Sequence, residues 1–394
     1  MEKKEIRIGM IGYQFMGKAH SHAYRDVPFF FDTKAKPVLK AIAGRNEEAL
    51  KEAAEKMGWE SYETDWKKLI ERDDIDVIDI VTPNDSHAEI AIAAAEAGKH
   101  IIIEKPLALN VEEAKRMYDA VKRNNVIHMV CYTYRFVPAV QYVKQLIDGG
   151  RLGRIYHFRA NYLQDFIMDP NFPLIWRLKK EIAGSGSLGD IGAHSIDLAR
   201  YLLGELEEVS AMTETFIKER PVGEMTGGLR ARTSSNEMGK VTVDDAVAFL
   251  ARFKSGAIGT FEATRFAGGN RNKNKFEING EKGSVRWDME NMNNLDVYFA
   301  DDEEGMQGFR TINCTEELHP YAGAYWSAGH IIGYEHTFIH LIYEFINGVV
   351  ENRNPVPNFE DGLKNQAVLA AIEKSAEDKS WEHIPSYLPE SLMN

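Results

Sequence analysis

Short apolar runs alternate with helical patterns through the first third of this 394-residue chain. The alternation is typical of a parallel sheet that carries helices on both faces. The expected strands are 6–11, 38–43, 77–81, 100–103 and 127–131. The expected helices are 16–25, 47–57, 66–72, 87–97 and 111–124. Residues 1–131 are therefore predicted to form a doubly wound α/β domain of the Rossmann type.

After residue 132 the pattern changes to longer runs of alternating polar and apolar residues, with turn signals at Asn279-Gly280 and Lys282-Gly283. The expected strands are 155–163, 209–217, 246–253, 258–264, 276–278, 284–287 and 295–299. The expected helices are 189–203, 334–350 and 359–375. Residues 132–394 are therefore predicted to form an α+β domain with a large, mostly antiparallel sheet.

The charge and composition of the chain argue against nucleic acid and membrane partners. The chain has 60 acidic residues against 47 Lys and Arg, so its formal charge of −13 repels nucleic acid and anionic lipid. It has no apolar run of about 20 residues and no signal-peptide pattern, so we expect no membrane partner and a cytoplasmic location. Cys131 and Cys314 lie far apart and are expected to be reduced thiols. No metal site is predicted.

The first expected strand leads into "IGYQFMG" at residues 11–17. A dinucleotide-binding turn has the pattern G-x-G-x-x-G, and Gln14 replaces its middle glycine. Gly12 would make the tight turn, Gly17 would let the helix approach the strand, and the pyrophosphate would lie at the helix N-terminus. Gln14 would take up space beside the phosphate but could donate a hydrogen bond to it. A strand, turn and helix without a ligand is the alternative interpretation.

The end of the second expected strand bears on the choice between NAD and NADP. The segment Ala43-Gly44-Arg45-Asn46 lacks the acidic residue that binds the ribose hydroxyls of NAD. Arg45 could bind the 2′-phosphate of NADP, stack on the adenine, or simply be a solvated surface charge. NAD and NADP both stay open, with a slight preference for NADP.

Glu104-Lys105-Pro106 follows a very apolar strand, at the sheet edge where ligands bind in this kind of fold. Partial burial would lower the pKa of Lys105 and suit it to stabilise an alkoxide or relay a proton. The peptide bond before Pro106 is a candidate for the cis form. The simpler interpretation is a lysine paired with Glu104.

Asp190 and His194 are four residues apart at the start of an expected helix and would share one face. The helix N-terminus disfavours imidazolium, so His194 would be a neutral general base that Asp190 orients. A zinc pair is the rival chemistry, but no third ligand has supporting spacing. A purely structural role for either residue also stays open.

These motifs together resemble the Gfo/Idh/MocA (glucose-fructose oxidoreductase / inositol dehydrogenase) family. They are Gly12 to Gly17 with Lys18-Ala19-His20, Thr82-Pro83-Asn84 with His87, Glu104-Lys105-Pro106, and Gly189 to His194. Within the family the chain looks closest to levoglucosan dehydrogenase-like sugar 3-dehydrogenases, through "FMGKAHSHAY" at 15–24, "YLQD" at 162–165, Trp176-Arg177, "AGSGSLGDI" at 183–191 and "HPY" at 319–321. Gln14 and the stretch 323–333 depart from the pattern.

The resemblance implies specific site residues. The implied catalytic residues are Lys105, Asp190 and His194. The implied sugar site consists of these three with Tyr134, Gln164, Trp176, Arg177, His319, Tyr321 and Tyr334. The expected cofactor-binding residues are Gly12, Tyr13, Gln14, Phe15, Met16, Gly17, Arg45, Thr82, Pro83, Asn84, His87, Glu104 and Lys105.

The resemblance also implies an activity and an assembly. The chain would be an NAD(P)-dependent dehydrogenase that oxidises a secondary hydroxyl, with C3 as the candidate position, of a pyranose, anhydrosugar or cyclic polyol. Its C-terminal sheet would pack between subunits of a homotetramer or homodimer. The alternatives are glycoside cleavage through a transient 3-keto intermediate and a non-catalytic sugar or dinucleotide sensor.

Overall fold

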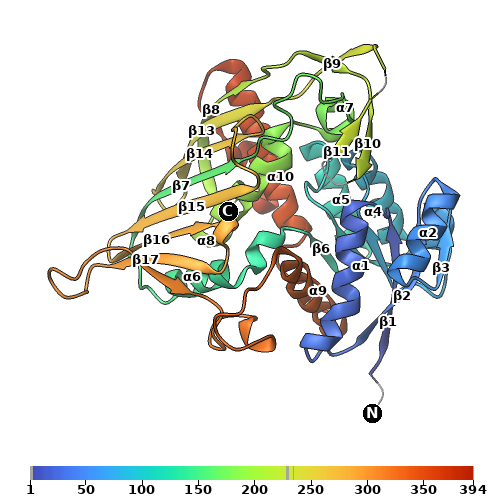
Figure 1. The fold of residues 1–394 in the computed structure, drawn as a ribbon, viewed down its shortest axis with the longest axis horizontal. Coiled ribbons are helices and arrows are strands. Elements are labelled where there is room, and N and C mark those ends of the chain that lie inside the picture. The colour runs from blue at the N-terminus through green and yellow to red at the C-terminus, as the bar shows by residue number, and fades with distance from the viewer. Residues whose placement is uncertain (1–2, 228–229, 234, 394) are drawn as a thin grey trace. The chain divides into compact units, whose positions relative to one another are not determined.

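The computed structural model describes residues 3–227, 230–233 and 235–393. The chain forms two compact units (Figure 1). The first unit contains Met1–Thr133, Thr226–Arg230 and Tyr334–Gln366, and the second contains Tyr134–Met225, Ala231–Gly333 and Ala367–Asn394. The division differs from a single cut after residue 131 because a late helical segment packs with the first unit. Among the described residues, no helix is long and apolar enough to cross a membrane.

The first unit is built on a six-stranded parallel sheet with the order β3-β2-β1-β4-β5-β6. Its strands are β1 (Glu5–Ile11), β2 (Lys36–Ala43), β3 (Ser61–Glu63), β4 (Val77–Ile80), β5 (His100–Ile103) and β6 (His128–Val130). The predicted Rossmann fold is confirmed. The chain crosses over between β1 and β4, and ligands bind at the carboxyl ends of the strands beside such a crossover.

Helices surround this sheet: α1 (Phe15–Phe30), α2 (Glu47–Met57), α3 (Trp66–Glu71), α4 (His87–Glu96), α5 (Val111–Arg123), α9 (Tyr334–Glu351) and the first turns of α10 (Phe359–Asp378). Figure 1 shows α9 beside α1. Helix α1 continues past the predicted end at Arg25, through Pro28, because Val27 is still buried. The short strand β3 was not predicted.

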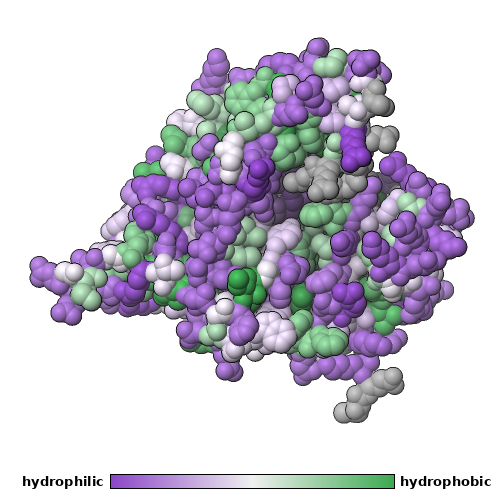
Figure 2. All heavy atoms as spheres, in the orientation of Figure 1, coloured by the Kyte–Doolittle hydropathy of each residue, from purple (hydrophilic) through white to green (hydrophobic). Residues whose placement is uncertain are grey.

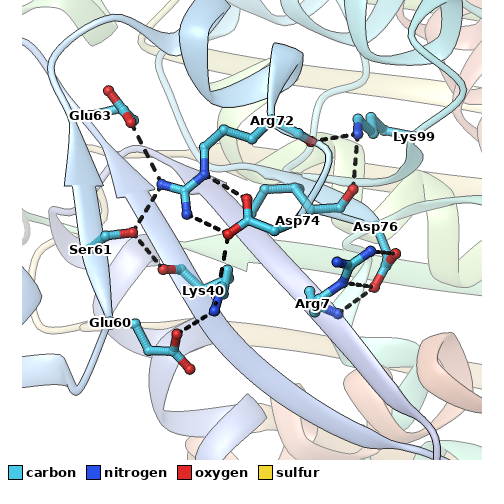
Figure 3. A network of polar contacts seen from close by, with 10 residues as sticks. Arg7, Lys40, Glu60, Ser61, Glu63, Arg72, Asp74, Asp76 and Lys99 are labelled. Atoms are coloured by element: carbon cyan, nitrogen blue, oxygen red, sulfur yellow. Dashed lines mark hydrogen bonds and ion pairs between the residues drawn. The ribbon is translucent and has the colours of Figure 1, made fainter.

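A network of ion pairs lies at the amino-terminal edge of the six-stranded sheet, opposite the carboxyl ends of its strands (Figure 3). Arg7 donates to both oxygens of Asp76, at 2.7 and 3.0 Å, where β1 and β4 begin. Arg72 binds Asp74 in the same bidentate way, at 2.8 Å for both contacts. Lys99 donates to the backbone carbonyl of Arg72. This network stabilises the amino-terminal edge and leaves the opposite edge for a ligand site.

The second unit contains a nine-stranded sheet with the order β18-β17-β16-β15-β7-β14-β13-β8-β19. Its strands are β7 (Ile155–Leu163), β8 (Leu206–Glu214), β13 (Ala246–Phe253), β14 (Ile258–Thr264), β15 (Lys273–Gly280), β16 (Gly283–Asp288), β17 (Asn294–Phe299), β18 (Arg310–Asn313) and β19 (Glu382–His383). Only β7 and β14 pair in parallel among these neighbours, so the predicted mostly antiparallel sheet is confirmed.

Helices α6 (Pro138–Asp148), α7 (Lys180–Ala183) and α8 (Ala193–Leu203) belong to this unit, and α6 and α7 were not predicted. Two small sheets pair β9 (Glu219–Pro221) with β12 (Met238–Lys240) and β10 (Glu224–Gly227) with β11 (Arg230–Arg232). The buried face of the large sheet is aromatic, because Phe158, Phe261 and Phe276 pack side by side. Figure 2 shows apolar side chains among polar ones over β8 and β13.

Candidate active site

The turn after β1 has the close contacts that its two glycines predict. Gly12 has a φ of +107°, and a Cβ there would lie 2.9 Å from the Val81 carbonyl oxygen. A Cβ on Gly17 would lie 2.8 Å from the carbonyl oxygen of Gly12. Strand and helix therefore approach as closely as a dinucleotide-binding turn requires.

Gln14 lies immediately before α1 and its side chain is exposed. Its backbone carbonyl accepts the first helical bond, from the Lys18 N–H at 2.9 Å, and its carboxamide makes no capping bond. The N–H groups of the first helical residues have no partner within the helix, which is the arrangement that binds phosphate. The Gln14 side chain is thus placed at the end of the helix where a pyrophosphate would bind.

The segment after β2 carries no acidic residue, and Arg45 is exposed. Asn46 caps α2 by accepting the Ala49 N–H at 3.1 Å. A Cβ on Gly44 would lie 2.4 Å from a carbon of the Tyr13 ring, so this ring packs directly against the backbone that leads to Arg45. Phe15 is 49% exposed at the start of α1.

His87 joins the loops that follow β4 and β5. Its Nδ1 lies 3.0 Å from the Pro106 carbonyl oxygen, and its Nε2 lies 3.1 Å from the Thr82 carbonyl oxygen. The ring is fully buried, and burial lowers the pKa of His87. Ser86 also holds the first loop, with its Oγ 2.7 Å from the Thr82 hydroxyl. His87 therefore supports the predicted cofactor loops from within the core.

Lys105 follows β5 at the carboxyl edge and is half-buried. Its backbone N–H donates to Glu104 Oε2 at 3.1 Å, and the Lys105–Pro106 bond is cis, as predicted. Glu104 is buried, and its other oxygen lies 3.1 Å from Nε2 of His20. Glu104 thus contacts the backbone of its neighbour on one side and a histidine of α1 on the other.

In the second unit, the predicted helix at 189–203 begins with a π-helical turn, η4 (Leu188–Gly192), and α8 follows it. Asp190 lies in this turn, and its carboxylate pairs with Arg177 Nη1 at 2.9 Å and Arg265 Nη1 at 3.6 Å. These two guanidinium groups fix the position of the Asp190 carboxylate. The orientation of His194 by Asp190 stays a prediction.

The loop before η4 is anchored by Asp244. Its carboxylate accepts the N–H groups of Gly186 and Leu188 at 2.7 and 2.8 Å, and the Ser187 hydroxyl at 2.6 Å. A Cβ on Gly186 would lie 1.8 Å from the Asp244 carbonyl oxygen, so only glycine fits this position. The glycine-rich stretch is therefore a rigid support for the π turn.

His194 is buried beside two tyrosine rings. The side chain is 8% exposed, and its ring lies 4.7 Å from that of Tyr134 and 6.0 Å from that of Tyr162. The Tyr162 hydroxyl donates to Asn272 Oδ1 at 2.7 Å, and Gln164 Nε2 donates to the same oxygen at 3.0 Å. Asn272 and Tyr162 thus connect the predicted residue Gln164 to Tyr134, whose ring lies against His194.

Sequence reasoning missed Tyr162 and Asn272. Tyr162 lies on the buried face of β7 with Phe158 and Ala160, so the alternation of that strand could have indicated it. Asn272 lies in the loop before β15 and carried no local signal. Their part in the site depends on contacts between residues about a hundred positions apart.

The other predicted sugar residues have different surroundings. Arg177 lies 4.4 Å from the centre of the Trp176 ring, in the short helix η3 (Trp176–Leu178). His319 is buried edge-on against Tyr142 at 4.9 Å, and burial lowers its pKa. Tyr321 has a left-handed backbone, with a φ of +64°. Tyr334 begins α9 in the first unit and packs against Phe338.

Comparisons with known proteins agree with this geometry. A family model described as an oxidoreductase family with an NAD-binding Rossmann fold matches residues 6–132, and one described as the GFO/IDH/MocA C-terminal domain matches residues 140–286. Levoglucosan dehydrogenase of Pseudarthrobacter phenanthrenivorans is 47% identical over 388 residues, which are 97% of this chain and 99% of the relative.

Two solved structures are similarly close. An oxidoreductase domain protein from Kribbella flavida is 49% identical, with a TM-score of 0.92, covering 97% of this chain and 100% of that one. A levoglucosan dehydrogenase in complex with NADH and levoglucosan is 47% identical, with a TM-score of 0.92, covering 96% of this chain and 99% of that one. The likeness therefore extends over both units.

Proposed function

We propose that this chain, which belongs to the GFO/IDH/MocA oxidoreductase family, oxidises a secondary hydroxyl of a pyranose or anhydrosugar to a ketone with NAD as the oxidant. Levoglucosan is the first candidate substrate, and C3 is the candidate position. The observation that carries the proposal is the buried His194, which lies against two tyrosines that an asparagine and a glutamine join in one hydrogen-bonded network.

Each catalytic residue has one role. His194 accepts the hydroxyl proton, since an imidazole is a base near neutral pH. Lys105 stabilises the negative charge that develops on the oxygen. Asp190, which Arg177 and Arg265 hold in place, orients the base. The nicotinamide, when bound, supplies the hydride acceptor.

The residues around His194 suit a sugar. Tyrosine rings stack on the apolar C–H faces of a pyranose, and amide groups read its hydroxyls. Gln164 has one buried amide oxygen with no hydrogen-bond partner among the described residues, so it can accept a bond from a ligand hydroxyl. Trp176 and Arg177 add an aromatic face and a donor.

NAD is a better candidate cofactor for this chain than NADP, although the segment after the second strand slightly favoured NADP. The matching family is described as NAD-binding, and the similar solved structure contains NADH. The turn at Gly12 and Gly17 has the backbone approach that a pyrophosphate needs, with Tyr13 packed over Gly44 beside it. A cytoplasmic location belongs to the same proposal, because both cysteines are free and the cytosol keeps thiols reduced.

The proposal includes self-association through the large sheet. Met212, Leu250 and Ile258 are 70%, 48% and 47% exposed on the outer face of neighbouring strands. Apolar surface of this kind favours packing against a second copy. Light scattering of the purified chain tests it: a dimer or tetramer supports the proposal, and a monomer at micromolar concentration contradicts it.

The deciding experiment is a screen of levoglucosan, monosaccharides, inositols and glycosides with NAD and with NADP. Accumulation of reduced cofactor with a ketone product supports the dehydrogenase. Release of an aglycone without reduced cofactor in solution would instead show glycoside cleavage. Sugar binding by calorimetry without turnover across the screen would show a sensor.

A further inference from the structure

A histidine and two carboxylates are buried together in the core of the first unit. Asp79 lies in β4, between the parallel neighbours β1 and β5, and is fully buried. Glu104 is 6% exposed, and His20 of α1 is fully buried. Burying a charge is costly unless it is paired and hydrogen-bonded, so an acidic side chain in a central strand needs a specific partner.

His20 is that partner for both carboxylates. Its Nδ1 lies 2.9 and 3.0 Å from the two oxygens of Asp79, and its Nε2 lies 3.1 Å from Glu104 Oε1. A neutral imidazole has one donor nitrogen, whereas imidazolium has two. Because an acceptor faces each nitrogen, the geometry fits a protonated ring between two ionised carboxylates.

The other groups around His20 are neutral. Burial raises the pKa of Cys131 to about 12, and burial together with the charge of Asp79 raises the pKa of Tyr24 well above its usual range. The apolar ring of Phe338 in α9 lies 5.5 Å from His20. Burial has the largest single effect and disfavours a charged imidazole, but the charge and hydrogen bond of Asp79 together with the contact to Cys131 outweigh it and raise the pKa of His20 well above 6.5.

Glu104 links His20 to the backbone of Lys105. One oxygen contacts His20 and the other accepts the Lys105 backbone N–H at 3.1 Å. One residue further, the Pro106 carbonyl oxygen lies 3.0 Å from His87. The backbone around the predicted catalytic lysine is therefore held from the core at two consecutive points.

A metal ion is the rival explanation, because His20, Glu104 and Cys131 each offer a donor atom within 4.8 Å of one another. A metal bound to Nε2 would displace the hydrogen bond to Glu104, while Nδ1 would still face Asp79. A protonated imidazole, with an N–H on each ring nitrogen, accounts for all three short contacts without a further ligand. The geometry therefore favours imidazolium over a metal.

We propose that His20 is a permanently protonated positioning residue, which joins Asp79 to Glu104 and thereby fixes the backbone of Lys105 at the carboxyl edge of the sheet. The effect on turnover rests on the proposed function, because it requires Lys105 to take part in the reaction. The protonation of His20 does not depend on that function.

Nitrogen-15 NMR of the histidine-labelled full chain tests the protonation without sugar or cofactor. The signals that disappear in His20→Gln should report N–H groups on both ring nitrogens up to pH 9. A ring that loses a proton below pH 9, or a stoichiometric metal content in the purified protein, would overturn the proposal. Because this measurement uses no substrate, failure of the proposed function leaves it intact.

Kinetics test the positioning. His20→Gln leaves Asp79 and Glu104 without a counter-charge, so we expect kcat to fall about 10- to 100-fold. Adding Asp79→Asn removes one of the two charges and should restore part of kcat. Cys131→Ala is the matched control, since it changes the same cluster without changing its charge, and kcat should stay near the wild-type value. Equal losses in Cys131→Ala and His20→Gln, or no loss in His20→Gln, would contradict positioning by charge.

Discussion

The hydroxyl oxygens of Tyr134 and Tyr162 lie 2.7 Å apart, with both rings against His194. The Tyr162 hydroxyl donates to Asn272, so the Tyr134 hydroxyl donates to Tyr162. The Asn272 amide nitrogen lies 3.5 Å from the Tyr134 oxygen and closes the ring of contacts. This cycle sets one direction of hydrogen bonding among the side chains beside His194.

Removing one hydroxyl should therefore affect sugar binding more than folding. Tyr162→Phe breaks two bonds of the cycle, and we expect the KM for the sugar to rise several-fold and the free energy of unfolding to fall by about 1 kcal/mol. Tyr156→Phe is the control, because Tyr156 lies on the same strand but is 43% exposed. Steady-state kinetics and urea unfolding of both variants check this, and equal KM values would rule out a role for the cycle.

His194→Ala should lower kcat about 10²- to 10⁴-fold, because it removes the general base. The dissociation constant of NAD should stay close to the wild-type value, as measured by calorimetry. His157→Ala, on the exposed side of β7, should leave both quantities unchanged. Full activity in His194→Ala would remove this residue from the mechanism.

Gln14→Gly should change the dissociation constant of NAD more than the KM for the sugar. Gln14 is exposed at the N-terminus of α1, so its carboxamide can contact or shift the pyrophosphate. Titration of NAD into wild type and variant, without sugar, measures the effect. Identical dissociation constants would mean that the glutamine side chain only faces solvent.

His128 should make the first unit sensitive to acid. Burial lowers the pKa of His128 from 6.5 to about 4, and Nδ1 accepts the Phe359 N–H at 3.1 Å. The unfolded chain binds this proton at higher pH than the folded one, so the stabilisation is complete above pH 6.5 and is lost as the pH falls toward 4. The loss amounts to about 3 kcal/mol.

The comparison with His128→Asn isolates the contribution of His128 protonation to the free energy of unfolding, because asparagine retains an acceptor but does not titrate. Urea unfolding between pH 7 and pH 4 should show a smaller loss of stability in the variant than in wild type. Parallel curves for the two proteins would show that His128 does not cause the acid sensitivity.

Local patterns predicted the architecture well, because the periods of strand and helix are encoded over short stretches. The Rossmann sheet, the antiparallel sheet and the turn between Gly12 and Gly17 all follow from such patterns. Helix α6 was not predicted, although Pro138 stands at its first position, where proline is favoured.

Long-range pairing was beyond local patterns. "VIDIV" at 77–81 suggested an ordinary buried strand, and nothing nearby indicates that Asp79 meets His20 from 59 positions away. The packing of α9 against α1 in the first unit also joins segments that are far apart in the sequence, so local patterns could not predict it. Asn272 joins residues of two other segments and could not be identified from its own loop.

Levoglucosan labelled with deuterium at C3 tests the central claim most directly. If the chain oxidises the C3 hydroxyl with NAD, mass spectrometry of the reduced cofactor should find one deuterium for each 3-keto product formed, and His194→Ala should form neither. Reduced cofactor without deuterium would contradict oxidation at C3, and conversion of the sugar without reduced cofactor would contradict the dehydrogenase itself.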